Sequence, residues 1–500
     1  MQKLLELVSS INKNKTKSVS IIEHGQSDGT KLYQLYELIS DGKVTCDEEA
    51  FAQLYPGSTN KNPYYKLKHE LRERLYNTAF FVDAKRSKLS SRREAMVQCQ
   101  YYHALSWMLG LLGARKNADT LTQKTLKIAG QYEFVHEYLS ALTRLSNTLT
   151  VEGRENELQK VNEEIITYTE ILRKQVLCNI YLKNIQVQYT KNRSSKEYIV
   201  KEISGYLQKL EALPESPDTL RSYYVYNILK LYALMAEHKY EQAIEVGSPI
   251  RERVKNYRYL DRVAFYGISV NLTACYIAMK RYEEGAAVLD DLLVQLKAVK
   301  SSFNWFKAKE MSFMLSIHSR RYDVSRAVFL EVMSSPRFSR MPEYIQETWR
   351  IFAAYKEILV KSGRLSEQKV KGKRTFRLRR YLNNVPTFSK DKRGLNVPIL
   401  LSQIVLLLQT KGYDELIDRF EALAKYRDRY LNPEVNYRSN IFLRMVLEIV
   451  KRNFERAEVE RKTAKLYGLL TEAPTDVMNQ SYDQEIIPYE DLWEIMLDTL

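Results

Sequence analysis

Apolar residues recur at intervals of three and four along most of this chain, which is the spacing of one face of an α-helix. Residues 94–112, 131–151 and 155–190 show this spacing clearly in the first half. Gly and Pro, the residues that interrupt helices, number only 17 and 12 among 500, so the helical stretches are long. The pattern predicts an all-α protein.

Three shorter helices are predicted near the N-terminus, at residues 31–39, 46–56 and 63–81, with Asp47 as the candidate N-cap of the second. Three short helices that end in a basic one are similar to a helix-turn-helix unit. The third helix could therefore direct its cations at phosphates, or those cations could simply pair with Glu70 and Glu73 on a solvated face. The cations concerned are Lys66, Lys68, Arg72 and Arg74.

A longer pattern repeats in the second half with a period of about 40 residues. The units contain an apolar helix, a basic or polar turn, an aromatic residue and often, three positions later, a small residue. The aromatic residues are Tyr240, Tyr282, Tyr322, Tyr413 and Phe454, and the small residues are Ala243, Gly285, Ser325 and Ala457. Tyr322 and Tyr413 lie 91 positions apart, so one unit between them lacks its aromatic residue, at about Leu365. Helix pairs that stack to complete one another's cores form an α-solenoid.

The aromatic residue followed three positions later by a small one resembles the start of the second helix in tetratricopeptide (TPR) repeats. The resemblance covers residues 220–470, with a period longer than the 34 residues usual in that family. It implies a right-handed α-solenoid that serves as a protein-interaction scaffold. The segment YLNNVPTFSKDKRGLNVPILL (381–401) also resembles a segment of bacterial helical-repeat proteins, a likeness that implies no activity.

These patterns divide the chain into four predicted parts, with a boundary at the two prolines of ALPESPDT (212–219). Residues 1–93 form a helical N-terminal region. Residues 94–212 form diverged helical hairpins, and 213–470 form the TPR-like repeats with a basic insertion at about 361–394. Residues 471–500 form an acidic tail or capping helix.

The net charge of +16 comes from two short windows. Residues 61–93 contribute +7 and residues 361–393 contribute +10, so the rest of the chain is close to neutral. The last thirty residues have the opposite character, with eight acids and no Lys or Arg. Charge concentrated in this way is informative about binding partners and association rates, not about the fold.

The second basic window falls where the repeat requires its second helix, between the helices expected at 342–362 and 397–411. Leu378, Leu382 and Val385 recur at helical spacing beside Tyr381, and Pro386 ends the helix by about Asn384. We therefore expect Phe376, Leu378, Tyr381 and Leu382 in the core. The remaining cations form a predicted patch for an anion or a partner: Lys371, Lys373, Arg374, Arg377, Arg379, Arg380, Lys390, Lys392 and Arg393.

Three targets for this patch stay open: nucleic-acid phosphate, an acidic segment of a partner protein, or the chain's own acidic tail. The tail sequence PYEDLWEIMLDTL (488–500) places Leu492, Ile495, Met496 and Leu500 on one helical face. It could cap the last repeat or dock on the basic residues and block them.

Sequence motifs for catalysis are missing. The six histidines are scattered, the four cysteines form no CxxC pair and are expected to be buried free thiols, and no phosphate-binding Gly-rich loop or nucleophile elbow occurs. No metal or cofactor is predicted. The longest apolar run, residues 397–408, is too short to span a membrane, and we expect a cytoplasmic protein.

The sequence thus predicts a non-enzymatic scaffold or regulatory adaptor that binds a partner protein or peptide through a TPR-like groove. The alternative is a nucleic-acid-binding regulator that uses residues 61–93 and 361–393.

Overall fold

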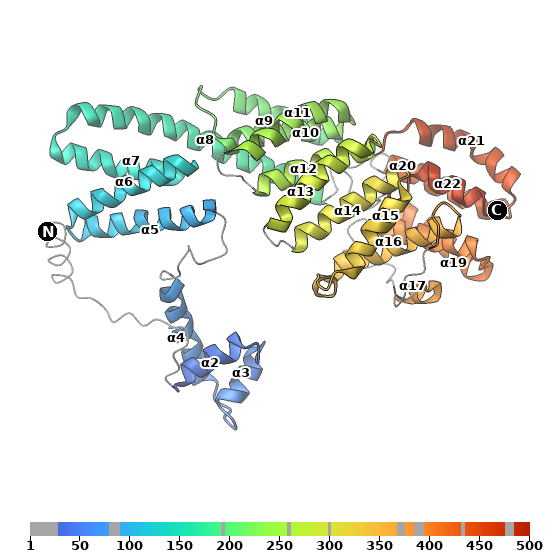
Figure 1. Ribbon diagram of the computed structural model, residues 1–500, viewed down its shortest axis with the longest axis horizontal. Helices are drawn as coiled ribbons and strands as arrows, with labels where there is room; N and C mark the ends of the chain where they lie inside the picture. Colours follow the sequence, from blue (N-terminus) through green and yellow to red (C-terminus); the bar gives the residue numbers. More distant parts are fainter. Residues whose placement is uncertain are drawn as a thin grey trace. The chain divides into compact units, whose positions relative to one another are not determined.

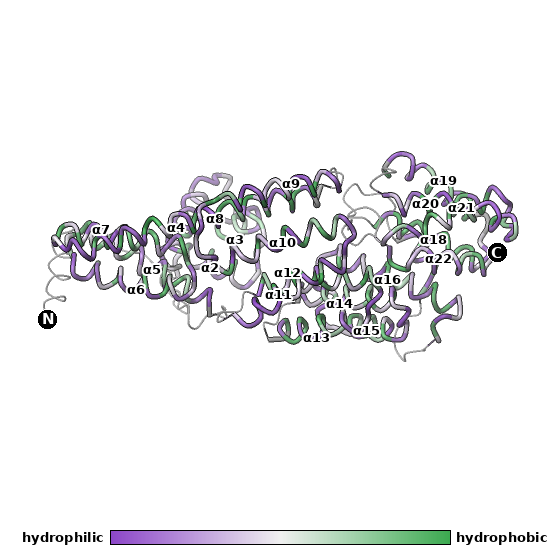
Figure 2. The backbone as a smooth tube through the Cα atoms, turned by 90° about the horizontal axis from the view of Figure 1, so that it is seen from above, coloured by the Kyte–Doolittle hydropathy of each residue, from purple (hydrophilic) through white to green (hydrophobic). Residues whose placement is uncertain are grey.

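The protein is all-α over the part of the chain that the computed structural model describes. Figure 1 shows its helices in chain order, and Figure 2 shows apolar and polar positions alternating along them. It divides into two compact units, residues 1–172 and 173–500. The described residues are 29–79, 91–191, 196–257, 262–298, 302–367, 376–384, 395–431, 436–475 and 485–500.

Unit 1 holds two separate groups of helices. The first three pack around a small apolar cluster of their own, which includes Leu35 and Tyr64. The next three contact one another in sequence. The helices of unit 1 are α2 (Lys31–Ser40), α3 (Asp47–Leu54), α4 (Asn62–Ala79), α5 (Ser91–Leu111), α6 (Arg115–Tyr132), α7 (Val135–Glu152) and α8 (Glu155–Lys191), which continues into unit 2.

Unit 2 is a succession of helices in which most pack against the next one, and α16 packs against α18. One continuous apolar core extends through it, from Cys178 to Met496. Its first helices are α9 (Lys196–Glu211), α10 (Leu220–Ala236), α11 (Tyr240–Asn256), α12 (Arg262–Ala278), α13 (Tyr282–Ala298), α14 (Ser302–His318), α15 (Tyr322–Ser334) and the 3₁₀ helix η1 (Phe338–Arg340). They are followed by α16 (Glu343–Lys361), α17 (Leu378–Asn384), α18 (Asn396–Gln409), α19 (Tyr413–Tyr430), α20 (Tyr437–Lys451), α21 (Arg456–Glu472) and α22 (Tyr489–Leu497).

The repeat is visible in the backbone of the turns. In the described part of unit 2, six turns contain a residue with positive φ, and the next residue donates its N–H to the carbonyl five positions earlier, at 2.8–3.0 Å. This bond satisfies a carbonyl that the end of a helix leaves unpaired. The positive-φ residues are His238, Lys280, Arg320, Gly363, Lys411 and Asn453, which lie 42, 40, 43, 48 and 42 positions apart. The structure therefore confirms consecutive helix pairs with a period close to that of the sequence pattern.

The helix pair that lacks an aromatic residue lies where the repeat period predicts it. Gly363 turns the chain after α16, and Leu365 is buried at the expected position. The late second helix is α17, which ends at Asn384, and α16 packs directly against α18. Tyr381 is in the core, and Phe376, Leu378 and Leu382 are packed against it. The core residues predicted for this stretch are confirmed.

The last repeat departs from the prediction. Asn453 and Phe454 both have positive φ, so Phe454 belongs to the turn and α21 begins two residues later, at Arg456. The buried residue in the first turn of the helix shifts by the same two positions. Val459 is fully buried, whereas Ala457 is exposed. The assignment of Phe454 and Ala457 as the marker pair was wrong.

Three local predictions also need correction. The residue before α3 is Cys46, whereas Asp47 is inside the helix and its carboxylate binds Tyr64 and Lys68 instead of capping. The apolar stretch 131–151 is interrupted at Glu133, where a positive φ separates α6 from α7. Cys46 is exposed, although Cys99, Cys178 and Cys275 are buried free thiols as expected.

Candidate functional site

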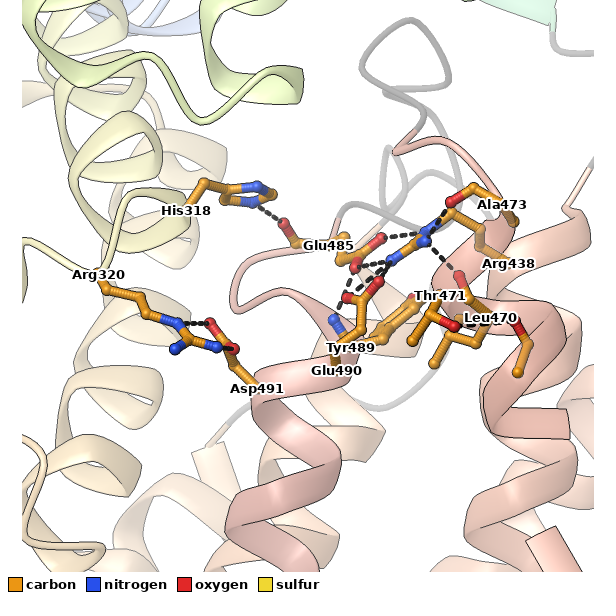
Figure 3. Close-up of polar contacts among 11 residues, drawn as sticks. His318, Arg320, Arg438, Leu470, Thr471, Ala473, Glu485, Tyr489, Glu490 and Asp491 are labelled. Atoms are coloured by element: carbon orange, nitrogen blue, oxygen red, sulfur yellow. Dashed lines mark hydrogen bonds and ion pairs between the residues drawn. The ribbon is translucent and has the colours of Figure 1, made fainter. Parts of the chain in front are cut away.

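The C-terminal segment, residues 485–500, lies against the repeats of unit 2 and forms several charged contacts with them (Figure 3). Its centre is Arg438, the second residue of α20, whose side chain is 7% exposed. The guanidinium donates to both carboxylate oxygens of Glu485, at 3.1 and 2.8 Å, and to both of Glu490, at 3.0 Å. Such paired bonds are among the strongest that side chains form.

The same guanidinium also satisfies the end of a helix. Its remaining nitrogen donates to the carbonyl of Leu470 at 2.8 Å and to that of Ala473, both at the C-terminus of α21. The last carbonyls of a helix have no partner within the helix and carry partial negative charge. Arg438 therefore joins the end of α21 to the C-terminal segment.

The ionisation of Arg438 follows from these contacts. Burial alone would lower its pKa, but the charges and hydrogen bonds of Glu485 and Glu490 outweigh burial and raise the pKa above its ordinary value. The guanidinium is therefore a permanent buried charge that two carboxylates balance.

Glu485 makes contacts with both its side chain and its main chain. One carboxylate oxygen accepts the N–H of Tyr489 at 2.6 Å, which satisfies a donor in the first turn of α22. Its carbonyl oxygen accepts a hydrogen bond from Nε2 of His318 at 2.7 Å. Full burial lowers the pKa of His318, so the imidazole is neutral and carries its proton on Nε2.

A second charged contact lies at the turn between α14 and α15. Arg320, the positive-φ residue of that turn, donates to both carboxylate oxygens of Asp491. The Asp491 side chain is only 2% exposed, whereas that of Arg320 is 63% exposed. The hydrogen bond that Arg320 donates to Asp491 raises the pKa of Arg320. A buried carboxylate is thus held by a guanidinium at the surface.

A third contact lies at the equivalent turn after α16. Arg364 is 3.2 Å from Glu494 and 3.9 Å from Asp498. Arg456, the first residue of α21, lies 3.7 Å from Asp498. Arginines from three separate turns or helix starts therefore meet the acids along one side of α22.

Apolar side chains fill the space between these ion pairs. Tyr489 stacks on Phe442 of α20, with ring centroids 4.3 Å apart, and its hydroxyl lies 2.9 Å from that of Ser439. Trp493 meets the same Phe442 edge to face. Of the side chains predicted to form one face of this helix, Leu492, Ile495 and Met496 are fully buried, whereas Leu500 lies beyond the end of α22 and is partly buried. We call the residues that receive the segment the tail face: His318, Arg320, Arg364, Arg438, Ser439 and Phe442.

The predicted anion patch is only partly described. Arg379 and Arg380 are exposed on α17, and Arg377 is exposed directly before it, whereas Tyr381 is buried. Lys371, Lys373, Arg374, Lys390, Lys392 and Arg393 lie outside the described residues. That these cations together bind an anion stays a prediction.

The basic face of α4 is partly neutralised. Lys68 pairs with Asp47 at 2.6 Å, and Arg74 pairs with Glu70 at 2.7 Å. The Lys68 and Tyr64 hydrogen bonds lower the pKa of Asp47. Arg72 lies 3.1 Å from the ring of His69, and Lys66 is exposed. Two of the four candidate phosphate contacts therefore already have acidic partners.

Sequence reasoning missed the residues of the tail face. Arg320 and Arg364 occupy the basic turns that the repeat pattern contains, so their position was visible but their acidic partners were not. Arg438 gave no signal, because its partners follow it by 47 and 52 positions. The excess of acids at the end of the chain was the usable clue. Five of those acids form ion pairs with arginines.

Comparison of the chain with models of protein families, with curated proteins and with solved structures finds no match. Among the described residues, no group of His, Cys, Asp or Glu is placed to hold a metal ion. No helix in that part of the chain is long and apolar enough to cross a membrane.

Proposed function

We propose that this protein is a non-enzymatic scaffold or adaptor, a right-handed TPR-like α-solenoid that binds a helical or peptide segment of a partner protein through its repeats. One observation carries the proposal. The repeats already hold a segment that is distant in sequence, the residues 485–500, through charged, aromatic and main-chain contacts. A surface that binds a segment in this way has the chemistry for binding a partner's helix, with aromatic anchors and paired charges.

The test is affinity capture with the full chain as bait, followed by mass spectrometry and by reconstitution with the purified partner. The control bait is an unrelated helical protein with a net charge of +16, because that charge alone retains acidic proteins nonspecifically. We expect one protein retained by this chain and not by the control, at a fixed stoichiometry. Retention of the same proteins by both baits would refute the proposal.

A second function, nucleic-acid binding, is favoured by one observation. Three exposed arginines lie in α17 or directly before it, Arg377, Arg379 and Arg380, and the sequence places more cations on both sides. A gel-shift titration in salt tests it, since phosphate contacts make affinity fall steeply with salt concentration. Failure of duplex and single-stranded probes to bind at low salt would eliminate this function.

A further inference from the structure

The described helices α16 and α18–α21 pack against one another in succession, α16 on α18, α18 on α19, α19 on α20 and α20 on α21. The segment 485–500 adds to this succession without interrupting it. Its main helix-to-helix contact is with α21, and its other contacts are with side chains at turns and on the face of α20. The helix pairs therefore contact one another directly, without the segment between them.

The contacts of the segment are those of a bound ligand. Aromatic and aliphatic anchors, Tyr489, Leu492 and Trp493, are buried in the centre, and carboxylates surround them. The carboxylates that contact the repeats form ion pairs with arginines, at Arg438, Arg320 or Arg364. Central apolar anchors surrounded by complementary charges are the usual arrangement at a protein–protein interface.

We infer that the tail face is a binding site for an acidic amphipathic α-helix of a partner protein, and that the segment 485–500 is a tethered competitor for it. This inference rests on the proposed function and names the partner's chemistry. The partner's helix would carry carboxylates spaced as Glu490, Asp491 and Glu494 and aromatic residues spaced as Tyr489 and Trp493.

The tethered segment competes with a partner's helix for the tail face. A tethered ligand acts at an effective concentration on the order of millimolar, so a free helix of equal intrinsic affinity binds the intact protein weakly. A full chain whose own segment has lost its anchoring carboxylates leaves the tail face available. Binding in trans should then become much tighter, with the tail face itself unchanged.

The experiment uses the full chain with Glu485→Gln and Asp491→Asn and a fluorescent peptide of the wild-type sequence 485–500, measured by anisotropy. We expect the doubly substituted chain to bind the peptide at least about tenfold more tightly than the wild-type chain. A peptide that carries the same two substitutions should bind at least about tenfold less tightly than the wild-type peptide. Equal affinity of both chains for the wild-type peptide would overturn the inference.

The matched control is the full chain with Asp323→Asn and Glu458→Gln. These acids pair with Arg326 and Arg461 at the surface, three residues away on their own helices. This chain also loses two negative charges, so a gain in peptide binding equal to that of the first variant would assign the effect to net charge and overturn the inference.

A second measurement needs no substitution and covers the case in which the variant fails to fold. In hydrogen exchange of the wild-type chain, we expect the amides of α22 to exchange at least about tenfold faster than those of α20, because a tethered ligand opens by itself. Equal exchange in both helices would make the segment an inseparable part of the core and overturn the inference. Neither measurement depends on the identity of the partner, so either can fail while affinity capture still finds a partner elsewhere on the repeats.

Discussion

Arg438 keeps its charge inside the protein because two carboxylates and two carbonyl oxygens surround it. Arg438→Ala would leave Glu485 and Glu490 without that partner in a buried place, which typically costs about 3–5 kcal/mol. We expect a loss of this size in the free energy of unfolding, measured by urea denaturation.

The matched control for Arg438→Ala is Arg461→Ala. It removes an exposed ion pair between Arg461 and Glu458, which both lie on α21. Pairs of that kind contribute at most about 1 kcal/mol. Losses of equal size in the two variants would show that the buried network does not hold the segment in place.

His318 makes the stability of this region depend on pH. Its pKa is lowered in the folded state by burial, against the opposing influence of Glu485, and Lys280 and Arg438 lower it further. The unfolded chain therefore binds the proton more readily than the folded one. The stabilisation is complete above the unfolded pKa of about 6.5 and is lost as the pH falls below it, with a slope of up to about 1.4 kcal/mol per pH unit.

Urea denaturation between pH 7 and pH 5 measures this dependence. His318→Gln keeps an N–H donor for the carbonyl of Glu485 and removes the titrating group, so its stability should change less over the same interval. Parallel pH profiles of the wild-type and His318→Gln chains would contradict the assigned role of His318.

At the scale of the helix, Gly285 tests the close approach that the repeat pattern requires. A Cβ at Gly285 in α13 would lie 2.8 Å from a methyl of Leu315 and 3.0 Å from Cβ of Tyr276. Gly285→Ala should therefore destabilise the protein by about 1–3 kcal/mol through overpacking, although Ala favours the helix.

Gly468 in α21 is the control for Gly285, because a Cβ there meets nothing within 4 Å. Gly468→Ala should stabilise by up to about 1 kcal/mol through helix propensity alone. Thermal unfolding of the two variants should thus shift in opposite directions. A stabilising Gly285→Ala would show that α13 and α14 do not require the small residue.

The same helices show what the sequence can and cannot predict. α17 was predicted, with an end by about Asn384, because Leu378, Leu382 and Pro386 encode it locally. The shift of the helix start from Phe454 to Arg456 was not predicted, because the positive φ of Asn453 and Phe454 depends on how the turn packs. The tail face was missed because its ion pairs join residues up to 171 positions apart, and no periodicity reports such a contact.

At the scale of the whole molecule, the two units differ in the core that each contains. Unit 2 has one cluster that runs from Cys178 to Met496, whereas α5–α7 of unit 1 pack around two small clusters that include Cys99 and Leu109. Local stability follows the amount of buried apolar contact. We therefore expect unit 1 to lose its structure at a lower temperature than unit 2.

Hydrogen exchange followed by mass spectrometry at rising temperature separates the two units, with α6 reporting on unit 1 and α12 on unit 2. Protection of α6 should be lost first. Arg438→Ala should lower only the temperature at which α12 opens, by about 2–4 °C for each kcal/mol lost, because its partners all belong to unit 2. A common transition in α6 and α12 that Arg438→Ala shifts as a whole would mean that the 37-residue α8, which crosses the boundary at residue 172, couples the units into one cooperative fold.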